Sequence, residues 1–162
     1  MKRVILILIL IAGLGITAAS FGPSVPQTDV KLYFTDAQIL KLIPVRKAIP
    51  ELSSEEQAKL VLRMLIEGDD DNLKIRRTIP HIRGCMSVRV ENKTAYVNIK
   101  KSMAENHAEG RDIELLTVYS IVNSLTSIKD ISTVKFTVNG KIQKDFMGYL
   151  DMRETFIPDY AV

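Results

Sequence analysis

The segment Leu115–Ile128 contains no charged side chain. Charged residues make up about 25% of an average chain, so a random stretch of this length lacks charge roughly 2% of the time. At helical spacing, one side of the segment is apolar. The other side holds Leu116, Thr117, Ser120, Asn123, Ser124 and Ser127. A surface helix normally presents Lys and Glu to water. The segment therefore predicts a helix with a core face and a second face suited to close packing.

The partner of this second face is open at the level of the sequence. A second molecule could cover it, and we take its six side chains as the candidate protein interface on that basis. The alternative is that another helix or a loop of the same chain covers the face. Small uncharged side chains suit both, because they allow close approach without the cost of burying a charge.

Residues 1–21 differ in composition from the rest of the chain. Lys2 and Arg3 precede an apolar run from Val4 to Ala19, which is the pattern of a signal peptide or an N-terminal membrane anchor. At about 1.5 Å per residue, the run is short for a hydrocarbon core of about 30 Å. The small residues of 17–19 would suit cleavage. Both alternatives place the remaining chain outside the cytoplasm, either tethered to a membrane or secreted.

The remaining sequence predicts a short linker and one domain. Residues 22–29 contain Gly22, Pro23 and Pro26, which favour an extended tether. Residues 30–160 have the length of a single domain with a hydrophobic core. Without the two basic residues of the leader, 20 basic residues face 19 acidic ones. This balance gives no electrostatic reason to expect a nucleic-acid partner.

The hydropathy pattern predicts an α+β fold, a two-layer sandwich of two helices on a small, mostly antiparallel sheet. One helix is expected between an N-cap at Ser53 and a C-cap at Gly68. The other is the uncharged segment. Strands are expected at 30–34, 40–45, 86–90, 95–99 and 134–138, with a last short one at 147–152.

Two turns and one edge position can be assigned from local residues. Asn92-Lys93 in a two-residue turn pairs Val90 with Ala95 and Val88 with Val97, which puts the apolar side chains on one sheet face. Asn139-Gly140 is a strong turn signal after residues 134–138. Pro44 lacks an N–H group and so predicts an edge strand.

The residues that could perform chemistry do not form a recognisable motif. His81 and His107 are the only histidines, and their spacing fits no metal or catalytic motif. Cys85 is the only cysteine, so no internal disulfide is expected and the thiol is interpreted as inert. The acidic run 69–71 lacks the glycine and glutamate of a calcium loop. We therefore expect no cofactor, no metal and no enzymatic activity.

An ordered set of motifs resembles the GerM domain, the sporulation and spore germination domain of bacterial envelope proteins. The resemblance covers about residues 30–160, and its most specific block is Leu116–Thr126. The other matching segments are 30–34, 42–46, 49–50, 58–68, 79–80 with Gly84, 95–97, 134–136 and 148–151. The family is regarded as non-enzymatic, and its fold is similar to that of ring-building domains in secretion systems.

The resemblance and the leader together imply a function. We expect a non-enzymatic, exported or membrane-tethered protein–protein interaction module in a cell-envelope or sporulation- and germination-associated assembly. Its expected partners are envelope proteins or further copies of itself, with membrane contact through the leader if it is not cleaved. The alternative is an accessory domain that binds peptidoglycan or another envelope glycan, although the chain contains no Trp for sugar stacking.

Overall fold

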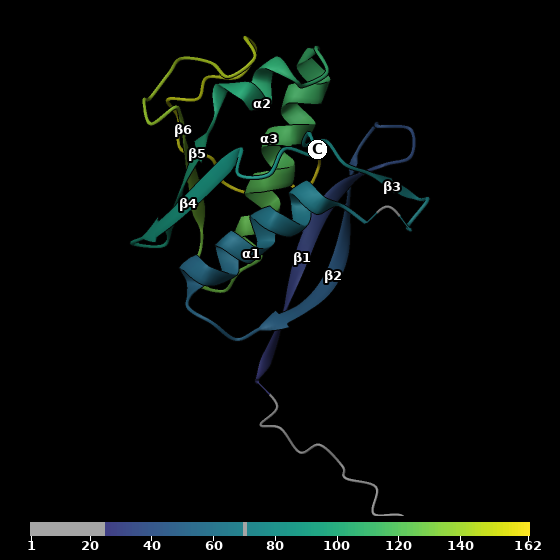
Figure 1. The fold of residues 1–162 in the computed structure, drawn as a ribbon, viewed down its shortest axis with the longest axis vertical. Coiled ribbons are helices and arrows are strands. Elements are labelled where there is room, and N and C mark those ends of the chain that lie inside the picture. Colours follow the sequence, from purple (N-terminus) through teal and green to yellow (C-terminus); the bar gives the residue numbers. More distant parts are fainter. Residues whose placement is uncertain (1–24, 70) are drawn as a thin grey trace, which may run out of the picture.

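The computed structural model describes residues 25–69 and 71–162 of the chain. The expected leader, residues 1–21, and residues 22–24 of the expected linker lie outside this part. The elements in chain order are β1 (Gln27–Asp36), β2 (Leu42–Pro50), α1 (Ser54–Glu67), β3 (Ile75–Arg76), β4 (Met86–Glu91), β5 (Thr94–Ile99), α2 (Lys101–Glu105), α3 (Arg111–Leu125) and β6 (Thr133–Val138) (Figure 1). Because β1 begins at Gln27, the domain starts three residues before the predicted boundary.

The strands form two separate three-stranded sheets, and the α+β class is confirmed. One sheet has the order β2-β1-β3 and is antiparallel throughout. The other has the order β4-β5-β6, in which β4 and β5 are antiparallel and β5 and β6 are parallel. Helices α1 and α3 lie between the sheets, and each contacts both of them (Figure 1). The expected single sheet is divided because α3 contacts β1 where a further strand could otherwise pair.

Helix α1 begins and ends where its sequence predicts. The Ser53 hydroxyl accepts a hydrogen bond from the Glu56 N–H over 3.4 Å, which caps the first turn. Glu55 and Lys59, one turn apart, form an ion pair of 2.6 Å. At the other end, the N–H of Gly68 bonds to the Met64 carbonyl over 2.8 Å, with φ of +75° at Gly68. This left-handed conformation favours glycine.

The β4–β5 hairpin has the predicted register. Val90 pairs with Ala95 and Val88 with Val97. Asn92 and Lys93 form the turn with φ of 49° and 61°, as a type I′ turn requires. The second predicted turn is also present, since Val138 and Lys141 bond to each other around Asn139-Gly140.

Strand β2 lies at an edge of its sheet, as Pro44 predicts. It is longer than expected and extends through Pro50. The prediction of a last strand at 147–152 is wrong, because this segment forms turns and bends. Its place at the sheet is taken by Phe156, which forms an antiparallel bridge with Val134. The physical reason is that Glu114 bonds the backbone N–H groups of 147, 149 and 150 and bends the segment around its carboxylate.

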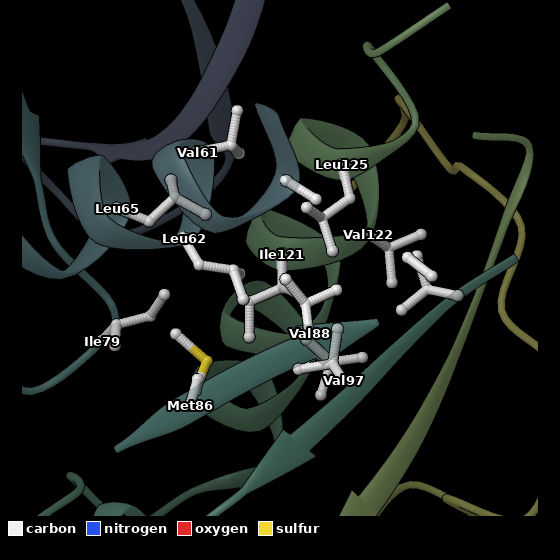
Figure 2. Close-up of a cluster of buried hydrophobic side chains, with 14 of the residues drawn as sticks. Val61, Leu62, Leu65, Ile79, Met86, Val88, Val97, Ile121, Val122 and Leu125 are labelled. Atoms are coloured by element: carbon white, nitrogen blue, oxygen red, sulfur yellow. The ribbon is translucent and has the colours of Figure 1, made fainter. Parts of the chain in front are cut away.

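The hydrophobic core extends from the two helices to both sheets, and its part beside the β4-β5-β6 sheet is shown in Figure 2. Side chains of α1, α3, β4 and β5 meet there, with Ile79 from the loop that precedes β4 (Figure 2). The labelled residues are Val61, Leu62, Leu65, Ile79, Met86, Val88, Val97, Ile121, Val122 and Leu125. The thiol of Cys85 is buried in the same cluster, free of any disulfide.

Candidate functional site

The small polar face of α3 binds the backbone of β1. Ser124 Oγ accepts the N–H of Tyr33 over 2.8 Å, and the Ser120 hydroxyl donates to the carbonyl of Tyr33 over 2.5 Å. One turn further along, Ser127 Oγ accepts the N–H of Lys31 over 2.9 Å. These groups of β1 point away from β2, where a neighbouring strand would normally bond them. The serines of α3 therefore complete the hydrogen bonding of a sheet edge.

The rest of this face binds other segments of the same chain. The Asn123 side chain donates to the carbonyl of Asp159 over 2.6 Å and accepts the N–H of the same residue over 3.0 Å. Thr117 Oγ1 lies 2.9 Å from His107 Nε2. Because the carbonyl of Ala108 can only accept, His107 Nδ1 carries the proton in their 2.9 Å hydrogen bond. The face thus fastens the C-terminal segment and the loop after α2.

Five of the six candidate interface residues are buried, and the sixth, Ser127, is partly buried. The exposed fraction is 4% for Leu116, 1% for Ser120 and 0% for Thr117, Asn123 and Ser124. Leu116 packs against Tyr33 and Leu42. The structure therefore shows the face against its own chain, which is the alternative left open by the sequence, and leaves little of it for a second molecule.

A buried carboxylate holds the loop after β6, and sequence reasoning missed it. Glu114 is 0% exposed, and its oxygens accept the N–H groups of Met147, Tyr149 and Leu150 over 3.2, 2.9 and 3.4 Å. Gly148, in the middle of this loop, has φ of +106°, which lets three N–H groups converge. Acidic residues in the first turn of a helix, here Asp112 and Glu114, are ordinarily interpreted as helix-dipole partners, so the sequence carries no signal for this cage.

A groove lies between α1 and β4. Its volume is about 640 Å³, within the range of ligand-binding pockets. The floor is apolar, with Leu62, Ile66 and Met86, and the rim is mostly basic, with Lys59, Arg63 and Arg83. The sequence missed it because the two walls come from elements that are far apart along the chain.

The titratable groups in the described residues do not converge on a common point. His81 bonds Arg77 in one loop, and His107 bonds Thr117 in another. Burial raises the pKa of the Cys85 thiol, which disfavours the reactive thiolate. In residues 25–69 and 71–162, no group of three His, Cys, Asp or Glu side chains is placed to hold a metal ion.

The part of the chain that the structure describes contains no helix with the length and apolarity that crossing a membrane requires. The expected anchor, if retained, would lie in residues 1–21, outside that part.

Three solved structures are similar in fold to the chain. The first GerMN domain of the sporulation protein GerM from Bacillus subtilis superimposes with a TM-score of 0.57 at 21% identity, covering 83% of this chain and 99% of that one. A candidate lipoprotein from Clostridium perfringens gives a TM-score of 0.58 at 19% identity, covering 83% and 89%. The tandem GerMN domains of the same B. subtilis protein give 0.58 at 20% identity, and the chain spans 45% of their length.

The sequence comparison agrees with the fold. No curated protein matches the chain significantly. The family model described as Germane, sporulation and spore germination, matches residues 31–144. The match begins in β1, includes both long helices and ends beyond β6, so the resemblance to the GerM domain is confirmed. The chain belongs to the Germane family of sporulation and spore germination domains.

Proposed function

We propose that the chain is a non-enzymatic, exported or membrane-tethered protein-interaction module of a bacterial cell-envelope assembly associated with sporulation or germination. The observation that carries this proposal is the family match over residues 31–144, which spans most of the folded domain. The leader supports export, because Lys2 and Arg3 precede an apolar run. The structural neighbours include a sporulation protein and a candidate lipoprotein.

The test is photo-cross-linking of the full chain in the bacterium that encodes it. A photoreactive residue is placed at Leu40 or Leu73, each 77% exposed, and as a control at Ile121, which is 0% exposed. We expect the tagged chain to be open to added protease in spheroplasts. We also expect cross-links from the exposed positions to a protein that mass spectrometry identifies as an envelope component.

Two results would overturn the proposal. One is a chain that stays protected from external protease while the spheroplasts are intact. The other is retention on purified cell wall together with the absence of protein cross-links from every exposed position tried, which would assign the chain to glycan binding.

A further inference from the structure

We infer that the groove between α1 and β4 binds an extended acidic peptide of a partner protein, which adds as a strand to the free edge of β4. This inference rests on the proposed function and names the surface and the partner chemistry within it. The argument starts from the direction of the backbone groups along β4.

Alternate residues of β4 point their backbone groups into the groove. The N–H of Val90 bonds to the Glu55 carboxylate of α1 over 3.1 Å, so it faces away from β5. Residues two apart on a strand share this direction. The N–H and carbonyl groups of Met86 and Val88 therefore also face outward, and both residues line the groove.

These outward groups lack a partner within the described chain. Apart from the pairing with β5, no hydrogen bond to the N–H or carbonyl of Met86 or Val88 is formed by any residue in 25–69 or 71–162. Val88 is nevertheless only 7% exposed. Backbone donors in such a place are normally satisfied, and an added strand bonds them in the geometry that the sheet already sets.

Two other outer edges, those of β6 and β2, are partly occupied or lack donors. Val134 and Val138 of β6 form bridges to Phe156 and Lys141. On β2, Pro44 and Pro50 lack N–H groups, and the N–H of Leu42 bonds to the carbonyl of Val162 over 3.1 Å. The β4 edge is thus the place where an incoming strand finds free donors, an apolar floor and a wall formed by α1.

The charged side chains at the rim of the groove determine which sign of charge a bound partner peptide should carry. Arg63 and Arg83 are exposed, and neither pairs with a carboxylate in the part of the chain described here. Lys59 is held by Glu55, and Glu67 is the acidic residue of the lining. The excess is positive, so an acidic strand is attracted, whereas a second copy of this groove would be repelled. Alternating side chains of the strand would place apolar groups over Leu62 and Met86.

The probe is a fluorescein-labelled eight-residue peptide of alternating Glu and Val, added to the full-length chain in detergent micelles. Fluorescence anisotropy should show saturable binding, and a peptide of alternating Lys and Val should not bind. Reversal of both rim charges, R63E with R83E, should weaken binding by at least about tenfold. The matched control is K135E on β6, which is exposed and outside the groove and should leave binding unchanged. Thermal unfolding checks that each variant is folded.

Strand pairing is separated from simple charge attraction by two N-methylated peptides. One carries methyl groups on the odd backbone nitrogens and the other on the even ones. In a bound strand only one set faces β4, so one peptide should lose binding by about tenfold or more and the other should retain it. Hydrogen exchange of the Met86 and Val88 amides should slow when the unmodified peptide is bound.

The outcomes are distinct. Equal binding of both methylated peptides would overturn strand addition, and binding unaffected by the charge reversals would overturn the groove as the site. Self-association of the chain that R63E with R83E abolishes would assign the groove to a second copy and overturn the acidic partner. Failure of all peptides to bind, while Leu40 or Leu73 still cross-links to an envelope protein, would refute this inference and leave the proposed function standing.

Discussion

Ser124 of α3 accepts a hydrogen bond from the backbone N–H of Tyr33 over 2.8 Å. A helix side chain here supplies the acceptor that a neighbouring strand usually supplies. Both residues are buried, and Ser120 bonds the carbonyl of the same Tyr33. Since a hydroxyl can both donate and accept, serine suits an edge whose N–H and carbonyl groups alternate. The absence of charge in Leu115–Ile128 follows from this docking against backbone.

Replacing Ser124 with Ala should destabilise the fold. The change leaves the buried N–H of Tyr33 without its acceptor, which costs about 1–3 kcal/mol. Urea unfolding followed by circular dichroism measures the free energy of unfolding. The control is Ser87→Ala, at an exposed position of β4 whose side chain forms no hydrogen bond within the described part of the chain, for which we expect a change within about 0.5 kcal/mol. Equal effects of the two substitutions would contradict the role assigned to Ser124.

Replacing Glu114 with Gln should loosen the loop after β6. An amide keeps one acceptor oxygen but turns an NH₂ group toward N–H donors, so at least one of the three bonds is lost, at a cost of about 1–3 kcal/mol. Hydrogen exchange should become faster at Met147, Tyr149 and Leu150 than in the hairpin. Glu109→Gln is the control, because Glu109 is exposed and its side chain makes no hydrogen bond to any residue of 25–69 or 71–162. A global loss of protection with no preference for this loop would argue against a local cage.

Gly68 and Gly140 form a matched pair for alanine substitution. Their φ angles are +75° and +76°, but a Cβ at Gly68 would lie 2.4 Å from Arg77 Cδ, whereas one at Gly140 meets nothing within 4 Å. Both changes should cost about 1 kcal/mol for the left-handed backbone. Gly68→Ala should cost more, since Arg77 must move and give up its 2.9 Å bond to the Glu67 carbonyl. Thermal unfolding compares the two, and equal losses would show that Arg77 relocates without penalty.

The pKa of Asp151 should be low. Hydrogen bonds from the Arg153 guanidinium and backbone lower it from 3.8 to about 2. Because the folded-state pKa lies below the unfolded one, the contribution of this pair to stability is present above pH 3.8 and is lost as the pH falls toward 2. NMR titration of the Asp151 carboxyl measures the value directly. In Arg153→Gln the pKa should return toward 3.8, while Lys129→Gln, remote along the chain and exposed, should leave it low.

The sequence was sufficient to predict those elements whose conformation depends on residues close together along the chain. The register of the β4–β5 hairpin depends on Asn92-Lys93 and on the alternation beside it, so Val88 could be paired with Val97 in advance. The limits of α1 follow from Ser53 and Gly68 for the same reason. In each case, interactions among a few neighbouring residues determine which backbone conformation has the lowest free energy.

Contacts between segments that are far apart in the sequence could not be predicted in the same way. The hydroxyl of Ser127 bonds the backbone of Lys31, 96 positions away in the sequence. The pattern indicated a face made for packing, but small polar side chains fit a backbone edge and a partner protein equally well. The cage around Glu114 and the α1–β4 groove are likewise formed only when distant segments meet. Tertiary contacts, and not local preference, decide these features.

The prolines of β2 also affect how many further strands can add to the sheets of this domain. Growth of a fibre by strand addition needs two open strand edges on each copy. One edge pairs with the preceding copy, and the other pairs with the next copy. Pro44 and Pro50 remove donors from β2, and Phe156 and Lys141 bridge the outer side of β6. In the part of the chain described here, β4 keeps outward backbone groups at Met86 and Val88 beside the groove. If a strand adds at β4, the missing donors of β2 and the bridges of β6 disfavour passing the pattern on to a further copy, so we expect the domain to join an assembly without seeding a filament.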